Sequence, residues 1–215
     1  MKAFDQVAGF YDDWYNHPQG RQVFNAELKA LESLIPDSGL GLEVGAGTGV
    51  FAESLTDQNM KIICLDPSGA MLEKAKERLM PAIMGVCEHI PITERAVGFT
   101  YMVTTLEFLE NPVAALIQVR ETTKKDAPLI IMFINADSAW GSLYRQIGAK
   151  GDPVFKHAKL RSLREVHEIL VDAGYTMQEC VGTLTTAPAE LEVGGDLKEP
   201  GPDTGVIVVR GLPEN

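Results

Sequence analysis

Apolar residues follow two different periods along this chain from Leu40 onward. Short apolar runs predict strands, and segments with apolar residues every three or four positions predict amphipathic helices. Their regular alternation is typical of a parallel sheet flanked by helices. Strands are expected at about residues 41–44, 61–65, 81–86, 97–104, 129–134, from 175 onward and at 205–209. Helices are expected at about 19–35, 50–58, 69–79, 113–123, 138–145 and 162–173.

The order of these elements predicts the sheet. The run 129–134 is the most apolar and should be a central strand that is buried on both faces. No helix is expected between the last two strands, which permits an antiparallel hairpin. We therefore predict an α/β fold: a doubly wound, seven-stranded, mostly parallel sheet whose last strand is antiparallel. Residues 185–203, rich in glycine, proline and acidic residues, are expected to form a mobile surface loop.

The length of 215 residues fits one domain spanning 1–215. Before the first strand, residues 1–36 are expected to form a helical lid, whose main helix is stopped by Pro36. After the fifth strand the regular alternation breaks. Residues 137–160 carry a short helix with two aromatic residues and then a loop, and we interpret them as an insertion that caps the substrate.

Composition narrows the possible partners. A net charge of −11 and a pI near 4.8 favour a small-molecule partner over nucleic acid. No apolar run approaches the length of a membrane span, and no apolar run follows Lys2, so neither a membrane association nor a secretory signal is expected. Cys64, Cys87 and Cys180 have neither CxxC nor metal-ligand spacing, so no metal and a cytoplasmic location are expected. The oligomeric state stays open.

A glycine-rich turn carries the clearest functional signal. Apolar residues lead to Glu43, glycines follow at positions 45, 47 and 49, and residues 51–55 continue in helical register. A buried strand, a tight turn and a helix N-terminus hold nucleotide-type cofactors in doubly wound sheets. The next strand ends in Asp66, whose carboxylate can accept hydrogen bonds from both hydroxyls of a ribose. The alternative is a structural strand-turn-helix joint with Asp66 near a helix N-cap.

These residues resemble a known family. Glu43-Val44-Gly45-Ala46-Gly47-Thr48-Gly49, followed by Leu65-Asp66-Pro67-Ser68-Gly69-Ala70-Met71-Leu72, resembles the first two motifs of class I S-adenosylmethionine-dependent methyltransferases. The resemblance is strongest to the small-molecule branch called type 11, and it covers about residues 4–182. It implies a methyltransferase with S-adenosylmethionine as cofactor and S-adenosylhomocysteine as product.

The chemistry of the two motifs agrees with this cofactor. Glycines without Cβ atoms let the backbone approach the cofactor closely. Glu43 would attract a sulfonium and an α-ammonium group, whereas it would repel a pyrophosphate. Pro67 and Met71 could pack on the adenine faces.

Two later segments extend the resemblance. Residues 85–92 align with the adenine-contacting segment, where the backbone of Cys87 would meet the adenine edge and Val86 replaces the usual aspartate. Residues 104–112 resemble the segment at the tip of strand four, where a carbonyl of Thr104 or Thr105 could hold the methionyl ammonium. The predicted cofactor-binding residues are Tyr11, Glu43, Gly45, Ala46, Gly47, Gly49, Asp66, Pro67, Met71, Cys87, Glu88 and Thr104.

In this family the acceptor is selected by the N-terminal segment and by the insertion after strand five. Aromatic residues there could attract a sulfonium through cation–π contacts, or could simply dock a terminal helix on the core. The family's equivalent of Tyr11 closes over the cofactor. The predicted acceptor contacts are Trp14, Tyr15, Phe108, Trp140, Tyr144 and His157.

No catalytic residue is assigned. In-line methyl transfer needs a base only if the acceptor must lose a proton, and the candidate bases are His157, His89, Tyr144 and, more weakly, His17. The expected function is methylation of a small molecule. The alternatives are a protein acceptor, a non-catalytic S-adenosylmethionine-binding protein and, more distantly, a nicotinamide-dependent oxidoreductase.

Overall fold

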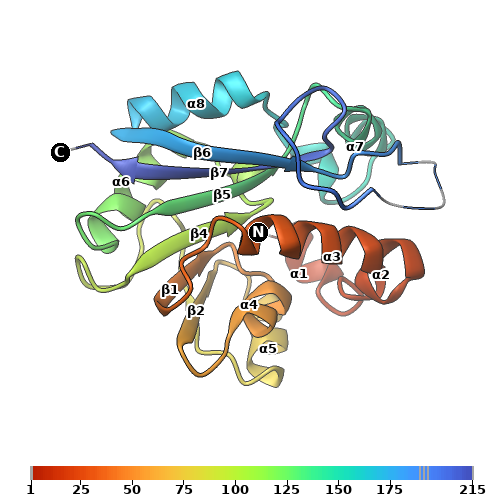
Figure 1. The fold of residues 1–215 in the computed structure, drawn as a ribbon. Coiled ribbons are helices and arrows are strands. Elements are labelled where there is room, and N and C mark those ends of the chain that lie inside the picture. The colour runs from red at the N-terminus through yellow and green to blue at the C-terminus, as the bar shows by residue number, and fades with distance from the viewer. Residues whose placement is uncertain (1, 189, 191, 193, 215) are drawn as a thin grey trace.

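The computed structural model describes residues 2–188, 190, 192 and 194–214 and contains a seven-stranded sheet with helices on both faces (Figure 1). The strand order is β3-β2-β1-β4-β5-β7-β6. The first five strands in this order are mutually parallel, and β7 is antiparallel to both of its neighbours. The predicted fold class is therefore confirmed. The strands are β1 Gly39–Val44, β2 Met60–Asp66, β3 Ala82–Met84, β4 Phe99–Val103, β5 Leu129–Ile134, β6 Tyr175–Thr183 and β7 Val206–Pro213.

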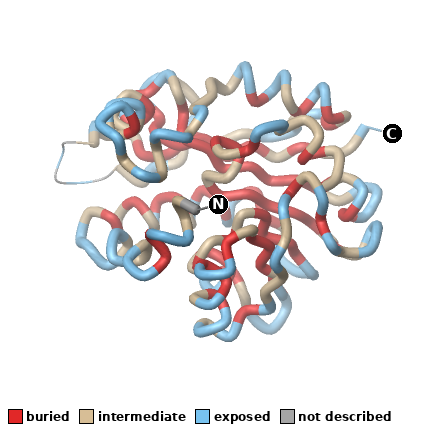
Figure 2. The backbone as a smooth tube through the Cα atoms, turned by 180° about the vertical axis from the view of Figure 1, so that it is seen from behind, coloured by how far each residue is buried: buried red, intermediate tan, exposed pale blue. Residues whose placement is uncertain are grey.

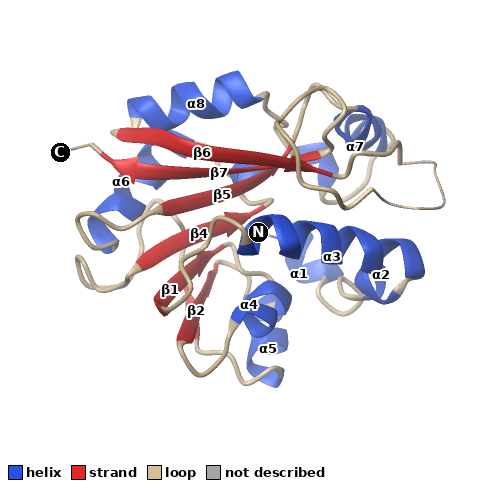
Figure 3. Ribbon diagram, viewed as in Figure 1, coloured by secondary structure: helices blue, strands red, loops and turns tan. Residues whose placement is uncertain are grey.

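Helices cover both faces of the sheet (Figure 3). One face packs against α3, α4 and α5, and the other packs against α6 and α8. The helices on the faces are α3 Pro18–Glu32, α4 Val50–Leu55, α5 Gly69–Glu77, α6 Pro112–Thr122 and α8 Leu163–Asp172. The other helical segments are α1 Lys2–Val7, α2 Asp13–Asn16, α7 Ala139–Ala149 and the 3-10 turns Leu106–Phe108 and Phe155–His157.

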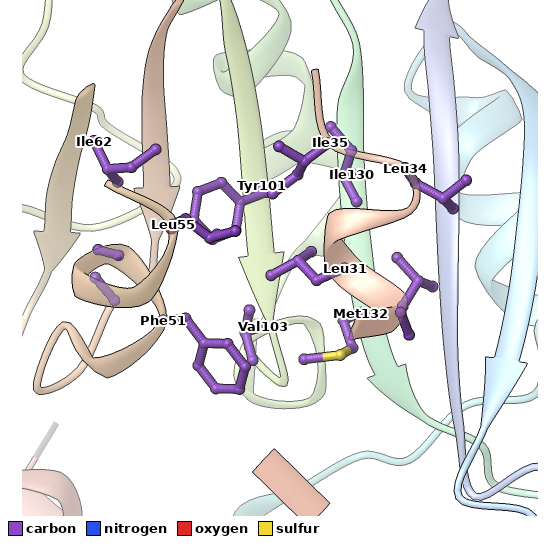
Figure 4. Packing of buried hydrophobic residues seen from close by; sticks show 14 of the residues in the cluster. Leu31, Leu34, Ile35, Phe51, Leu55, Ile62, Tyr101, Val103, Ile130 and Met132 are labelled. Atoms are coloured by element: carbon purple, nitrogen blue, oxygen red, sulfur yellow. The ribbon is translucent and has the colours of Figure 1, made fainter. Parts of the chain in front are cut away.

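Each central strand contributes to two hydrophobic cores because its side chains alternate between the two faces. Tyr101 and Val103 of β4 pack with α3 and α4, whereas Met102 between them packs on the opposite face. Figure 4 shows the first core, where Leu31 of α3 and Phe51 of α4 approach the same face of the sheet. In Figure 2 the buried residues run along the strands, and the exposed residues lie on the outer sides of the helices.

Polar side chains fix where several helices begin. The Ser68 hydroxyl accepts a hydrogen bond from the Met71 N–H and so caps α5. Asn111 caps α6 in the same way, directly before Pro112. Ser162 and Glu165 form a reciprocal capping box at the start of α8. These pairs satisfy backbone donors that have no partner inside the helix.

The structure differs from the predicted pattern mainly at the ends of elements. The predicted N-terminal lid contains three helical segments, and α7 extends beyond the predicted short helix. The third strand is shorter than predicted because the chain bridges back on itself between Val86 and His89. In the described part of 185–203 there is no helix or strand, yet this segment does not lie free on the surface. Its Thr186 carbonyl accepts a hydrogen bond from the Trp140 indole, and Leu197 packs against the core.

The arrangement of the elements leaves one edge of the sheet available for a site. Strands β2 and β3 follow β1 on one side of it, whereas β4 and β5 lie on its other side. The direction in which strands are added therefore reverses between β1 and β4. Ligands of open α/β sheets bind outside the carboxyl ends of the strands at such a switch point. Helices α1–α3 and α7 gather at the same end of the sheet (Figure 1). Among the described residues, no helix is both long and apolar enough to cross a membrane.

Candidate functional site

A large cavity of about 1180 Å³ lies at the carboxyl edge of the sheet. Its floor is formed by the ends of β1, β2, β4 and β5, and its walls come from α1–α3, α7 and the segments around 85–88, 152–155 and 184–188. Most of the predicted site residues line this one cavity. They are Tyr11, Trp14, Tyr15, Gly45, Gly47, Asp66, Pro67, Met71, Cys87, Glu88, Thr104, Phe108, Trp140 and Tyr144.

The glycine turn after β1 needs residues without a Cβ atom for two different reasons. Gly45, Gly47 and Gly49 all have positive φ angles, of 72°, 54° and 75°, which glycine adopts without steric penalty. A Cβ atom on Gly45 would lie 2.3 Å from the Thr105 hydroxyl oxygen, so close packing requires glycine there. A Cβ atom on Gly47 would have no heavy atom within 4 Å, because this residue faces open space. Gly47 therefore offers bare backbone to a ligand.

Asp66 organises the same turn from the end of β2. Its Oδ2 atom accepts a 2.8 Å hydrogen bond from the Gly47 N–H, and its Oδ1 atom accepts one of 2.8 Å from the Ser68 N–H. Burial raises the pKa of Asp66, and the two backbone donors oppose that rise. The carboxylate is thus held in a fixed orientation at the cavity wall.

Thr104, directly after β4, has a strained backbone. Its φ angle is 44°, which is a genuine outlier for a β-branched residue. Its N–H donates a 2.9 Å hydrogen bond to the Met132 carbonyl of the neighbouring strand, and this bond helps to hold the conformation. Strain of this kind concentrates at functional sites, and Thr104 lines the cavity.

Four predicted site residues do not line the cavity: Glu43, Ala46, Gly49 and His157. Glu43 is 1% exposed, and its Oε2 atom accepts a 3.0 Å hydrogen bond from the Tyr101 hydroxyl inside the core. Burial raises the pKa of Glu43 to about 8, and the Tyr101 hydrogen bond opposes this shift. The Glu43 side chain therefore lies in the core, on the side of the turn away from the cavity. His157 is exposed and borders a separate hollow of about 280 Å³.

The N-terminal segment is fastened across the glycine turn. The Asp12 carboxylate accepts hydrogen bonds from the Thr48 hydroxyl at 2.6 Å and from the Arg78 guanidinium at 2.8 Å. Farther along, the Ser68 hydroxyl donates a 2.5 Å hydrogen bond to the Asp5 carboxylate. These contacts hold Tyr11, which follows α1, against the cavity.

The opposite wall comes from α7 and the segment after it. Trp140 is 3% exposed, and its indole N–H donates a 2.8 Å hydrogen bond to the Thr186 carbonyl. The rings of Tyr144 and Phe155 lie 4.4 Å apart. Because aromatic rings from two distant parts of the chain face one cavity, the predicted lid and insertion both contribute to the same site.

The segment after β3 supplies a third part of the wall. Val86 lines the cavity. Because valine has an apolar side chain, the cavity has no carboxylate at the position where the family usually has an aspartate. Cys87 is buried, and its Sγ atom lies 3.7 Å from the Ala115 carbonyl oxygen. Burial raises the pKa of the thiol, so Cys87 contributes here as a protonated, packed side chain.

The sequence pattern did not identify two buried carboxylates near the site, Glu27 and Glu107. Glu27 on α3 is 7% exposed and lines the cavity, and burial raises its pKa to about 8. Glu107 is 2% exposed; one of its oxygens accepts a 2.8 Å hydrogen bond from the Ile134 N–H, and burial raises its pKa to about 7. Glu27 did carry a signal, because it lies four positions from both Val23 and Leu31 on the apolar side of a predicted helix.

The charge of the cavity limits what it can hold. Its charged lining residues are all acidic: no Lys, Arg or His belongs to the described lining. A pyrophosphate cofactor is bound by donors and positive charge, whereas the described charged side chains of this wall are all carboxylates. A ligand with a sulfonium and an ammonium group suits it. The acidic lining residues are Glu27, Asp66, Glu88, Glu110 and Asp152.

Comparison with known proteins agrees with this geometry. A family model described as a methyltransferase domain matches residues 42–131, which include the glycine turn and Asp66. A solved S-adenosylmethionine-dependent methyltransferase from Thermotoga maritima, described as a possible histamine N-methyltransferase, is 31% identical, with a TM-score of 0.88 over 98% of each chain. An uncharacterized protein from Methanocaldococcus jannaschii is 33% identical over 175 residues, which are 81% of this chain and 82% of that protein.

More distant structures share the fold alone. A methyltransferase from Aquifex aeolicus is 20% identical, with a TM-score of 0.70 over 97% of this chain and 98% of that one. The full-length match to the Thermotoga protein, together with the methyltransferase model over the glycine turn, shows that this chain belongs to the class I S-adenosylmethionine-dependent methyltransferases.

Proposed function

We propose that this protein transfers the methyl group of S-adenosylmethionine to a small-molecule acceptor. The observation that carries the proposal is the cavity at the strand ends, in which the glycine turn, Asp66 and an aromatic N-terminal segment meet. Its volume of about 1180 Å³ exceeds the range of about 300–1,000 Å³ that is common for sites holding one ligand. There is room for a cofactor and a small acceptor side by side.

The residues present fit S-adenosylmethionine. Bound there, it supplies a methyl group made electrophilic by a positively charged sulfur. Asp66 would accept hydrogen bonds from the ribose hydroxyls, and the open Gly47 would allow close approach of the backbone. Pro67 and Met71 would flank the adenine. The same proposal assigns cofactor contacts to Tyr11, Gly45, Cys87, Glu88 and Thr104.

The lining does not offer a histidine as a general base. His17, His89 and His157 are all absent from the described cavity lining. Tyr144 does line the cavity, but burial raises the pKa of its hydroxyl further above the ordinary value, so it stays protonated. We therefore expect rate enhancement to come mainly from holding the acceptor in line and from excluding water.

A cytoplasmic location is part of the proposal. Cys64, Cys87 and Cys180 are all free thiols, as expected in a reducing compartment. The description of the Thermotoga relative as a possible histamine N-methyltransferase gives amines priority among the acceptors to be tested here.

The test combines binding with product formation. Calorimetric titration of the purified protein with S-adenosylhomocysteine should show binding. Incubation with methyl-labelled S-adenosylmethionine should then move label into the low-molecular-weight fraction of a metabolite extract and not into protein. Label in the protein fraction would instead favour a protein acceptor. Binding without any labelled product would favour a non-catalytic binding protein, and no binding at all would exclude the proposal.

A further inference from the structure

The cavity is unusually rich in aromatic rings as well as in carboxylates. Nine of the chain's 15 aromatic residues line it, although aromatic residues make up only 7% of the sequence. Aromatic faces attract cations, and they do so more strongly where water is excluded. Among the described residues that line the cavity, every charged side chain is acidic. The cavity therefore favours positively charged ligands. The lining aromatics are Phe4, Phe10, Tyr11, Trp14, Tyr15, Phe108, Trp140, Tyr144 and Phe155.

Glu27 differs from the other four carboxylates of the wall. Asp66 and Asp152 each accept two backbone hydrogen bonds, which account for their positions. Glu88 is half-buried and Glu110 is exposed. Glu27 is buried and lines the cavity, and no side chain or backbone group of the described residues forms a hydrogen bond or ion pair with its carboxylate. A buried carboxylate without a partner is unfavourable unless a cation or a proton neutralises it.

Helical geometry explains why Glu27 faces the cavity. Gln19, Val23 and Glu27 follow each other at four-residue spacing on α3, and all three line the cavity. Leu31 continues this row at the same spacing and packs into the core together with Val23 and Ala30, so this side of α3 faces the interior of the protein. The Glu27 carboxylate on α3 therefore faces the cavity, which residues of α1, α2 and α7 also line.

Three phenols that line the same cavity and one further acid interact electrostatically with Glu27. Burial, with a further contribution from the Glu27 charge, raises the pKa values of Tyr11, Tyr15 and Tyr144, so these rings lie within electrostatic range of it. Glu107 adds to the effect of burial in raising the pKa of Glu27 to about 8. No basic side chain is among the groups that shift it. Without a ligand, Glu27 is therefore mostly protonated near neutral pH.

We propose that Glu27 is the anionic anchor of the acceptor subsite and that the acceptor carries a protonated amine, with the rings of Tyr11, Tyr15 and Tyr144 around it. This inference rests on the proposed function, because it assumes that cofactor and acceptor share the cavity. The acceptor class is an amine with a small apolar or aromatic body. Acceptors whose only charged group is a carboxylate or a phosphate are disfavoured by the same wall.

Calorimetry with three probes of similar shape tests the charge preference. The protein saturated with S-adenosylhomocysteine is titrated near neutral pH with 2-phenylethylamine, the neutral 2-phenylethanol and the anionic 3-phenylpropionate. We expect the amine to bind about tenfold or more tightly than the alcohol, and the acid to bind weakest. Glu27→Gln should remove most of the amine preference while the alcohol affinity stays within about twofold. Glu32→Gln, on an exposed position of the same helix, is the matched control.

A second measurement needs no variant and so does not depend on how well Glu27→Gln folds. Binding of the ammonium form should displace the proton from Glu27, so the binding enthalpy of the amine should change with the ionisation enthalpy of the buffer. The alcohol should show no such dependence.

The outcomes separate the two proposals. If S-adenosylhomocysteine does not bind, the proposed function fails. If it binds but the amine shows no preference over the alcohol, no proton release, or no binding at all, the Glu27 subsite is wrong and the proposed function stands. An amine preference that persists unchanged in a folded Glu27→Gln variant likewise overturns the assignment.

Discussion

The Asp12 carboxylate accepts a 2.6 Å hydrogen bond from the Thr48 hydroxyl and so joins the N-terminal segment to the glycine turn. The other oxygen of Asp12 pairs with the Arg78 guanidinium at 2.8 Å, and Arg78 also pairs with Glu53. Asp12 directly precedes α2, and Thr48 lies in the turn between β1 and α4, so the two residues share no helix or strand. The pair therefore links the glycine turn to the segment that carries Tyr11, Trp14 and Tyr15.

Replacing Asp12 should weaken cofactor binding by loosening this link. In Asp12→Ala the Thr48 hydroxyl and Arg78 lose a common partner, and Tyr11 is held less firmly against the cavity. Because the pair is only partly buried, we expect an effect of about 1 kcal/mol, or a roughly fivefold weaker affinity for S-adenosylhomocysteine. Calorimetry measures it, and Asp13→Ala, at the exposed neighbouring position, serves as the control. Equal affinities of the two variants would contradict a role for the link.

Replacing Asp66 should have a larger effect on the same affinity. Asp66→Ala removes the acceptor of the Gly47 and Ser68 N–H groups and the proposed ribose contact. Hydrogen bonds to charged groups contribute about 1.5–3 kcal/mol, so affinity for S-adenosylhomocysteine should fall by a factor of about 10 to 150. Asp57→Ala is a matched control, since Asp57 also accepts two backbone N–H groups, but in an exposed turn outside the cavity lining. If both variants bind equally well, the ribose role is wrong.

The two glycines of the turn should respond differently to alanine. Gly45→Ala places a Cβ atom 2.3 Å from the Thr105 hydroxyl oxygen, so it should lower the melting temperature as well as the affinity. Gly47→Ala adds a methyl group in open space, and its left-handed backbone should reduce stability by only about 1–2 kcal/mol. Its main effect should be on binding of S-adenosylhomocysteine. Differential scanning calorimetry and titration separate the two effects; a Gly47→Ala variant with unchanged affinity would show that no ligand approaches this residue.

Glu43 should make the protein less stable as the pH rises. Burial raises the pKa of Glu43 to about 8 in the folded protein, against about 4.3 for an unfolded glutamate. The folded state therefore favours the protonated form, and this contribution is complete below the unfolded pKa and is lost as the pH rises through the folded one. Besides burial, three groups shift the pKa of Glu43: hydrogen bonds from the Tyr101 hydroxyl and the Ala52 backbone lower it, and the charge of Asp66 raises it.

The variant Glu43→Gln removes that titration. The free energy of unfolding of the variant, minus that of the unaltered protein, should increase as the pH rises from about 5 to about 8. The slope of this difference should be at most about 1.4 kcal/mol per pH unit. Urea unfolding at several pH values measures the difference. Glu32→Gln, at an exposed position, should run parallel to the unaltered protein. A constant difference for Glu43→Gln would mean that this carboxyl does not titrate in the range.

The sequence by itself determined the elements whose signals are local. The alternation of strands and helices, the three glycines and Asp66 at a strand end predicted the doubly wound sheet and a glycine turn after its first strand, and the structure has both. These features could be predicted because each depends on a few neighbouring residues: on side-chain period, on the need for positive φ, or on a cap. The family resemblance added the cofactor.

Only the tertiary structure decided which side chains enter the site. Glu43 and Tyr101 are direct neighbours in the parallel register of β1 and β4, so their side chains share a face and Glu43 points into the core. Glu27 on α3 lines the same cavity as Tyr144 on α7, which lies far from it in sequence. The strain at Thr104 likewise depends on its bond to Met132 of the next strand. Contacts between distant segments follow from strand order and helix packing, and no local pattern of residues encodes them.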